Sequence, residues 1–401
     1  ACDNALNETD YTYSISSETF YNTVEEANAA VLAPLDAMRS AYNSNFFATL
    51  EINTEYCYPK GVYQTYKQYN GFVNATHMNR SDSNWQSLYK AIMFCNTAIE
   101  RIPNATKMTE EEKVAYLGEL RFLRGFNYFN LVKYWGGVPL KTDKNITEWN
   151  IPKSSKEEVY NFIIEDLKYA LDNCPDKKRY LATPDKNTVR VCLADVYMHT
   201  GDYIEAKKLS GEVVNSGAYQ LVQVAEPRDF DKVFGADLTT STEEIFYIKT
   251  SRIDGKTWDY LSYTSHPKYE FVPGKTMLNG NGYYTHYTDL RNHIIKSWDT
   301  NDLRYGMNIG FYVFGKDAYG EYTCLLTKYT DPNAQGNGAN VSIPLIRYTD
   351  AMLIYSEACA RVANAPTTES IEMLNQLRRR AYGKDPKVPN AELDYKLSDY
   401  A

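Results

Sequence analysis

The most regular pattern of apolar residues in the chain runs from residue 117 to residue 135. Two apolar rows recur there at steps of three and four, formed by Leu117, Leu120 and Leu123 and by Phe122, Phe126, Phe129 and Val132. Steps of this size are typical of a helix, and two adjacent rows indicate a helix that is buried on several sides. Gly136 and Gly137 supply a helix end, and Pro139 excludes a continuation. We therefore predict a central core helix that ends at Trp135.

Two arginines belong to this helix, although most of its surface is apolar. Arg121 and Arg124 are three residues apart and lie on the same side of the helix. A buried guanidinium needs carboxylate or carbonyl partners. We therefore expect both side chains to connect the central helix to its neighbours.

Start signals predict further helices on both sides of the central one. A Ser or Thr followed three residues later by Glu predicts helix starts at Thr23, Thr109 and Ser155. The first of these helices runs to about Tyr42, the second is the central helix, and the third ends near Pro175.

Apolar periodicity adds one more helix and a helix pair. A helix is predicted from Asn84 to about Arg101, with Trp85 in its buried row. The segment 188–219 predicts two helices joined by a tight turn, and its pattern resembles a tetratricopeptide repeat through Ala194, Tyr197, Gly201, Tyr203 and Ala206. One such pair cannot bury its own apolar face, so we expect other helix pairs to stack on it.

After Tyr219 the apolar period changes from helical steps to short alternating runs, which predict strands at residues 219–224, 244–250, 309–314 and 323–328. Helical periodicity returns at Pro344 and predicts two helices, over 345–362 and 367–383. The fold class is therefore mainly α: a tetratricopeptide-repeat-like helical scaffold with an inserted loop-rich lobe that contains short β-strands.

Tyrosine is unusually common, with 36 residues among 401, and many tyrosines lie in two loop-rich segments, 43–83 and 251–306. Sugar rings stack on aromatic faces, and amides and carboxylates bind sugar hydroxyls, so we expect these segments to bind a polar ligand. The predicted ligand-binding residues are Trp258, Tyr260, Tyr283, Tyr284, Tyr287, Trp298, Tyr63 and Tyr66. The alternative is a lobe whose aromatic side chains only hold its own loops together.

Charge and motifs exclude several classes of function. The net charge is −8 and the basic residues are scattered, which argues against a nucleic-acid partner. No apolar run reaches the length of a membrane span. His286, Asp289 and His293 would share a face if they were helical, but no third histidine supports a metal site. The sequence holds no nucleophile elbow, phosphate-binding loop or cofactor fingerprint, so we predict no catalytic residue, no metal and no cofactor.

The seven cysteines show no zinc-binding spacing. Cys95, Cys192 and Cys359 lie on apolar helix faces and are interpreted as buried thiols. Whether Cys57, Cys174 and Cys324 form disulfides is left open by the sequence. Cys2 lies in a short polar segment, as the lipidated cysteine of a mature bacterial lipoprotein does after its signal peptide is removed.

Two blocks of this sequence resemble the SusD/RagB family of outer-membrane nutrient-binding lipoproteins of Bacteroidetes. The first block is ELRFLRGFNYFNLVKYWGGVPL at 119–140, supported by Trp85, Leu88, Tyr89, Ile92 and Asn96. The second block runs from Leu345 to Ala358 and continues from Ile371 to Ala381, and we interpret its polar members as scaffold ties. The family continues with a further helix and a tail that we do not find before Ala401, so we expect this tail to be missing.

The resemblance implies a division of the chain and a function. We predict a lipoprotein tether at 1–10, a helical part at 11–225, a ligand-binding lobe at 226–342 and a returning helical pair at 343–401. The implied function is that of a surface-exposed protein, anchored to the outer membrane by lipid on Cys2, that binds oligosaccharides and passes them to a SusC-like TonB-dependent transporter. The alternatives are the same fold binding peptides, as RagB-like members do, a glycan hydrolase, and a scaffold that binds only protein.

Overall fold

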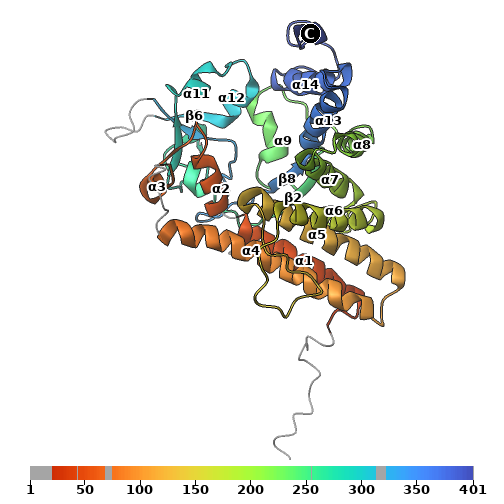
Figure 1. The fold of residues 1–401 in the computed structure, drawn as a ribbon. Coiled ribbons are helices and arrows are strands. Elements are labelled where there is room, and N and C mark those ends of the chain that lie inside the picture. The colour runs from red at the N-terminus through yellow and green to blue at the C-terminus, as the bar shows by residue number, and fades with distance from the viewer. Residues whose placement is uncertain (1–19, 43, 68–74, 254, 313–321, 401) are drawn as a thin grey trace, which may run out of the picture.

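The computed structural model describes residues 20–42, 44–67, 75–253, 255–312 and 322–400. Its larger part is a stack of helices in which each helix packs against the next, as Figure 1 shows. In stacking order these helices are α1 (Val24–Ala41), α4 (Ala75–Arg101), α5 (Glu110–Trp135), α6 (Lys156–Asn173), α7 (Lys186–Thr200), α8 (Tyr203–Val214), α13 (Tyr348–Ala363) and α14 (Thr368–Ala381). The predicted mainly α fold class is confirmed.

Local sequence signals set the helix ends as predicted. Thr23, Thr109 and Ser155 each form a capping box at the start of α1, α5 and α6, respectively. Gly201 ends α7 with a φ of 86°, a left-handed conformation that glycine adopts without strain. The start of α4 was predicted wrongly, because this helix begins at Ala75 and not at Asn84. The added turns, 75–83, are mostly polar and therefore carry no apolar row from which to predict a helix.

A buried charge network fixes α5 to its neighbours, which confirms the role predicted for its arginines. The Arg124 guanidinium donates to both carboxylate oxygens of Asp166 in α6, with Nε–Oδ2 and Nη2–Oδ1 distances of 2.7 and 2.8 Å. Its Nη1 also donates to Asn96 in α4 at 2.8 Å and to Asp143 at 2.6 Å. Arg121 Nη1 lies 3.6 Å from Asp166. Arg124 and Asp166 are almost fully buried, so every charge in the centre of the network has a partner.

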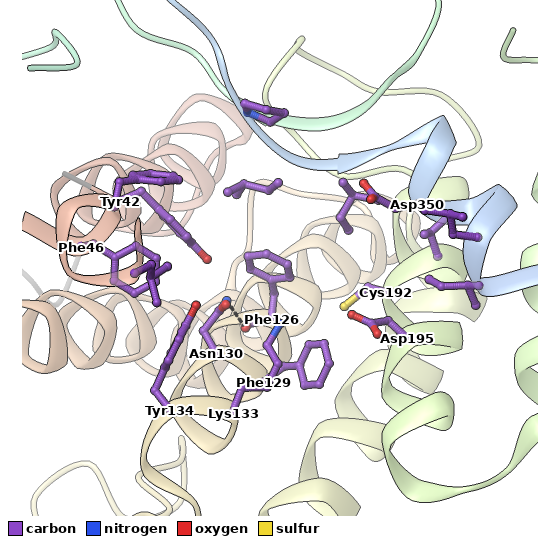
Figure 2. Close-up of a pocket in the computed structure, with 18 residues that line it drawn as sticks. Tyr42, Phe46, Phe126, Phe129, Asn130, Lys133, Tyr134, Cys192, Asp195 and Asp350 are labelled. Atoms are coloured by element: carbon purple, nitrogen blue, oxygen red, sulfur yellow. Dashed lines mark hydrogen bonds between the residues drawn. The ribbon is translucent and has the colours of Figure 1, made fainter. Parts of the chain in front are cut away.

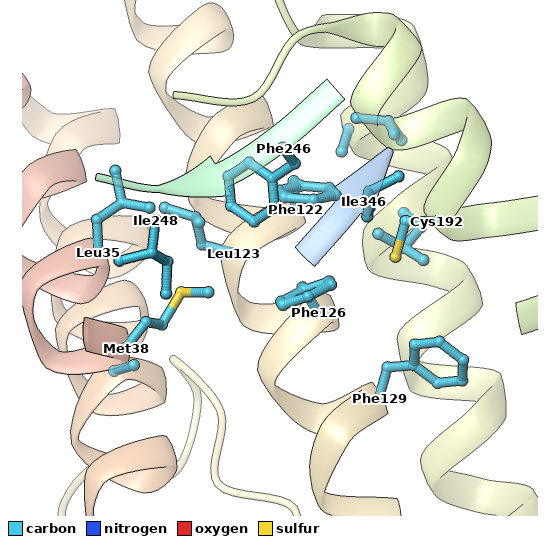
Figure 3. Packing of buried hydrophobic residues seen from close by; sticks show 14 of the residues in the cluster. Leu35, Met38, Phe122, Leu123, Phe126, Phe129, Cys192, Phe246, Ile248 and Ile346 are labelled. Carbon is cyan, nitrogen blue, oxygen red and sulfur yellow. The ribbon is translucent and has the colours of Figure 1, made fainter. Parts of the chain in front are cut away.

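A two-stranded antiparallel sheet lies across α5 and connects the helical stack to the lobe, as Figure 3 shows. It pairs β2 (Glu244–Ile248) with β8 (Ile343–Arg347). The Phe246 ring contacts the rings of Phe122 and Phe126 at centroid distances of 5.3 and 5.5 Å. The prediction that the last helical segment begins at Pro344 is wrong, because residues 343–347 extend to pair with β2 and the helix starts at Tyr348.

Buried arginines of the returning helices confirm the second block as a set of scaffold ties. Arg380 of α14 pairs with the fully buried Glu243, which lies directly before β2. The same carboxylate accepts the Val222 backbone N–H at 3.0 Å. Asp350 caps α13 by accepting the Arg347 N–H at 2.7 Å. Helix α14 is thereby fixed to the centre of the fold.

The lobe contains a four-stranded sheet with the order β1-β5-β7-β6. The strands are β1 (Tyr58–Pro59), β5 (His286–Asp289), β6 (Ile309–Phe311) and β7 (Thr323–Leu326). The predicted strand 309–314 is therefore shorter, with 313–314 outside the described residues. The prediction for 219–224 is wrong because these residues form no strand. The edge strand β1 comes from the first loop-rich segment, so residues far apart in sequence meet in one sheet.

Short elements complete the lobe and its connections. The segment 44–52, predicted as loop, is helix α2 (Ser44–Ile52). The other short helices are α3 (Gln64–Lys67), α9 (Asp231–Phe234), α10 (Leu261–Thr264), α11 (His293–Ser297) and α12 (Leu303–Asn308), and the remaining strands are β3 (Glu270–Val272) and β4 (Lys275–Thr276). The domain boundaries at residues 10, 225 and 342 stay a prediction.

Replacing Asp166 by alanine should lower the free energy of unfolding by about 3–5 kcal/mol, because the Arg124 charge would then lose its bidentate partner in the core. Lys208→Ala is the control, since Lys208 is 60% exposed in its ion pair with Glu205 and exposed pairs contribute about 1 kcal/mol or less. Urea denaturation of both variants measures the difference. Equal stability of the two variants would contradict the importance of the network.

Candidate functional site

The two aromatic loop segments meet in the lobe. Tyr58 in β1 lies opposite Tyr287 in β5, and their ring centroids are 5.8 Å apart. The Tyr63 ring lies 5.4 Å from the Tyr263 ring and 5.1 Å from that of His286. Aromatic side chains of the two loop-rich segments, which are far apart in the sequence, therefore belong to one cluster.

The predicted ligand-binding residues do not all reach the surface of this cluster. Tyr283 is 50% exposed, whereas Trp258, Tyr260 and Tyr63 are only 1%, 5% and 2% exposed. The others are half-buried, and they are Tyr66, Tyr284, Tyr287 and Trp298. Only the exposed and half-buried rings have a face that a ligand can reach in this conformation.

The prediction that Trp258 binds the ligand as part of an open aromatic array is wrong. Its ring is enclosed by those of Phe47, Tyr260 and Tyr329, at centroid distances of 5.1, 5.3 and 5.0 Å. A ring covered by protein on all sides cannot stack on a sugar. Trp258 forms part of the hydrophobic core instead, Tyr260 lies in the same core but also lines a cavity described below, and Tyr63 belongs to a small buried cluster with Ile52 and Cys57.

The accessible part of the lobe cluster is a surface that we call the Tyr283 face, formed by Tyr283, Tyr284, Lys60, Asn281 and Asn337. The Asn337 amide donates to the Tyr283 hydroxyl, and Lys60 Nζ lies 3.2 Å from the centroid of the Tyr284 ring. Asn281 Nδ2 donates to the Gly336 carbonyl at 2.9 Å, which orients its side chain. The face thus combines an exposed ring with oriented amides and an ammonium group.

A cavity of about 400 Å³ lies at Trp298, and we call it the Trp298 cavity. Asp302 accepts the Trp298 indole N–H at 3.3 Å, which fixes the orientation of the ring. Two ionisable side chains, Glu51 and Lys328, also line the cavity. Its lining is Phe47, Glu51, Tyr56, Tyr260, Thr264, Ile294, Ile295, Trp298, Asn308, Ile309, Leu326, Lys328 and Tyr329.

The electrostatics of the Trp298 cavity come from its two ionisable groups. Burial disfavours the charged ammonium and, with the nearby Arg347, lowers the pKa of Lys328 to about 8, although Glu51 and Asp350 oppose this effect. Glu51 accepts a hydrogen bond from the Tyr56 hydroxyl. The cavity therefore offers both a donor and an acceptor within a largely apolar wall.

Sequence reasoning missed the contributions of α2 and Lys328 to this cavity. Phe46 and Leu50 are four residues apart and Phe47 and Glu51 likewise, a spacing that is typical of a helix. That signal could have revealed α2. No local signal points to Lys328, because its burial depends on side chains that are distant in sequence.

The cysteines and histidines of the lobe show no metal-binding geometry. His286 lies on β5 and His293 begins α11, so the helical face considered for these residues does not form. In the part of the chain that the structure describes, no group of three or more His, Cys, Asp or Glu side chains could hold a metal ion.

The open question about disulfides is answered for the described cysteines. Cys57, Cys174 and Cys324 are buried free thiols, as are the three cysteines predicted to be buried on helices. Burial raises the pKa of the Cys324 thiol to about 12, which makes it a weak nucleophile. Cys2 lies outside the described residues.

Comparison with known proteins defines the class to which this fold and lobe belong. Residues 3–198 match the family model described as "Starch-binding associating with outer membrane", and residues 195–394 match the model of the SusD family. Together the two matches span nearly the whole chain. The protein therefore belongs to the SusD/RagB family, which confirms the resemblance seen in the sequence.

Individual relatives support this assignment. Two SusD-like proteins of Formosa agariphila, P2 and P38, are each 26% identical to this chain. The P2 alignment covers 92% of this chain and 76% of P2, and the P38 alignment covers 100% and 84%.

Solved structures share the fold at lower identity. A SusD homolog from Bacteroides thetaiotaomicron superposes with a TM-score of 0.79 at 19% identity, over 95% of this chain and 81% of the homolog. A protein described as a laminarin-binding SusD-like protein superposes with a TM-score of 0.74 at 19% identity, over 93% of this chain and 86% of its own.

Trp258→Ala should lower the free energy of unfolding by about 3–5 kcal/mol, because it removes a large buried ring from the core. The surface variant Tyr283→Ala should change it by about 1 kcal/mol or less. Denaturant unfolding monitored by circular dichroism measures both values. If Trp258→Ala left the stability unchanged and abolished ligand binding, Trp258 would be a ligand-binding residue and not a core residue.

Proposed function

We propose that this protein is a surface-exposed lipoprotein that binds oligosaccharides and passes them to a SusC-like TonB-dependent transporter of the outer membrane. Membership of a family described as starch-binding and associated with the outer membrane supports the ligand class and the location. The laminarin-binding protein of the same fold supports a glycan ligand further. The transporter partner is an extension from the SusD/RagB resemblance.

The half-exposed Tyr283 is the observation that carries the proposed ligand class. Its ring offers an apolar face to solvent, while its hydroxyl accepts from the Asn337 amide. A pyranose ring has an apolar C–H face and an equatorial rim of hydroxyls, so it can stack on the ring and bond the amides together. Tyr284, Tyr287 and Trp298 remain proposed contacts, with Tyr66 at the edge of the cluster.

The mechanism is reversible binding without bond cleavage. Stacking on Tyr283 supplies apolar contact, and Asn281, Asn337 and Lys60 supply hydrogen bonds to hydroxyls. An exposed ring favours sugars over peptides, because a peptide needs an enclosed groove that satisfies its backbone amides. The Trp298 cavity would take a terminal or branching sugar of the same ligand.

Membrane attachment is part of the proposal. Among the described residues, no helix is both long enough and apolar enough to cross a bilayer. We propose lipid on Cys2 as the anchor, since a lipid chain attaches a folded domain to a membrane without a spanning segment.

Tyr283→Ala should weaken binding of the oligosaccharide by about tenfold, which corresponds to about 1.4 kcal/mol, because stacking on the exposed ring is lost. Tyr180→Ala is the matched control, since Tyr180 is also 50% exposed but follows α6, outside the lobe. Calorimetry with laminarin and starch oligosaccharides, followed by a peptide panel, measures the affinities. Binding of peptides alone would replace the glycan with a peptide ligand, and release of reducing sugar would indicate a hydrolase.

Cys2→Ser, introduced into the complete precursor, should move the protein from the membrane fraction to the soluble fraction of cells, because the acylated thiol is absent. The nearby substitution Asn4→Ser serves as the control and should leave the membrane fraction unchanged. Fractionation with immunodetection measures the distribution. Membrane retention of Cys2→Ser would contradict the proposed anchor.

A further inference from the structure

A pocket of about 370 Å³ lies on the helical scaffold, next to the Trp298 cavity. Phe47 lines both spaces. The pocket forms where α5, α7 and the junction of β8 with α13 meet the end of α1 and α2, as Figure 2 shows. It belongs to neither part of the lobe site.

The walls of the scaffold pocket are strongly aromatic. Six aromatic side chains line it, and they are Tyr42, Phe46, Phe47, Phe126, Phe129 and Tyr134. Aromatic ring faces carry partial negative charge and attract cations. One ring already holds a cation of the chain itself, because Lys133 Nζ lies 4.1 Å from the centroid of Phe129.

Two carboxylates line the side of the pocket opposite Tyr42 and Tyr134. Figure 2 shows Asp195 and Asp350 across from Tyr42 and Tyr134, with Phe126 and Phe129 between the two sides. Lys133 is the single basic residue of the lining, so the lining has a net charge of −1 when both aspartates are charged. Asp195 Oδ1 also lies 3.4 Å from Nδ1 of His199, which is outside the lining. Burial raises the pKa of Asp350, and a cation bound nearby would favour its charged form.

A buried hydroxyl that lacks a good hydrogen bond also faces this pocket. Tyr42 is 5% exposed, and its hydroxyl has no hydrogen bond of good geometry in the described part of the chain, although the Asn130 side chain lies beside it. The neighbouring Asn130 amide donates elsewhere, to the Phe126 carbonyl at 2.8 Å. A buried hydroxyl without a good hydrogen bond is unfavourable, so a ligand that carries a hydrogen-bonding group would gain by occupying this position.

From these contacts we propose that the scaffold pocket binds a small organic cation: an ammonium group on a compact apolar body with a hydroxyl or carbonyl group. The rings would cover the apolar body, Asp195 and Asp350 would attract the ammonium, and Tyr42 would bond the polar group. This site does not depend on the proposed glycan function. The cation is either a free small molecule or a lysine side chain of a partner protein, which share this chemistry.

Choline and 3,3-dimethylbutan-1-ol form a suitable probe pair, because they share shape and hydroxyl group and differ in charge. Choline should bind the complete protein about tenfold more tightly than its neutral isostere, since only choline gains from the rings and carboxylates. Saturation-transfer NMR and calorimetry measure the two affinities. Nα-acetyl-lysine methylamide, tested alongside, represents the partner's lysine, and the tighter cation identifies the source.

Asp195→Asn should weaken choline binding by about tenfold, because it removes a charge from the pocket. Asp176→Asn is the matched control, since it makes the same change at a side chain that is 85% exposed and outside the pocket. Tyr42→Phe should weaken choline binding and leave thermal stability unchanged or higher, as expected when a buried hydroxyl without a good hydrogen bond is removed.

The proposal is overturned if neither choline nor the lysine probe binds, if choline and its isostere bind equally, or if Asp195→Asn and Asp176→Asn behave alike. Tyr283→Ala should bind choline as the unmodified protein does. Because this variant tests the lobe alone, failure of the glycan proposal and failure of the cation proposal can be distinguished.

Discussion

The bidentate contact between Arg124 and Asp166 is the interaction on which the helical stack depends. A guanidinium in the middle of an apolar helix is costly unless it is fully paired, and its partners must come from other segments. Here they come from α4, α6 and the loop after α5, so the charge is satisfied only when three segments take their native positions. The requirement selects one arrangement of these helices among many with similar apolar contact.

The lobe follows from that arrangement because its entry and exit strands, β2 and β8, pair directly on α5. Within the lobe, aromatic rings provide much of the internal packing that aliphatic side chains provide in most cores. Trp258 and Tyr260 are enclosed by other rings, whereas Tyr283 keeps a face in solvent. The same residue type thus builds the lobe and, where one ring lacks a cover, offers a surface for a ligand.

Features with local causes could be predicted from the sequence. The apolar rows of α5, the capping boxes and the Gly201 turn each depend on residues within a few positions of one another. Features with distant causes could not. Residues 343–347 form a strand because β2, about a hundred residues earlier, pairs with them. Trp258 and Tyr283 look alike in sequence, but Trp258 is enclosed by Phe47, Tyr260 and Tyr329, and Phe47 and Tyr329 are distant from it in the chain.

The central claim is that the Tyr283 face receives a glycan. Hydrogen–deuterium exchange with and without saturating laminarin oligosaccharide tests it most directly, because it locates the contact without a substitution. The account predicts slower exchange in residues 281–284 and around Lys60 and Asn337, with α7 and α8 unchanged. Protection confined to the helical stack, or slower exchange spread evenly over the protein, would contradict it.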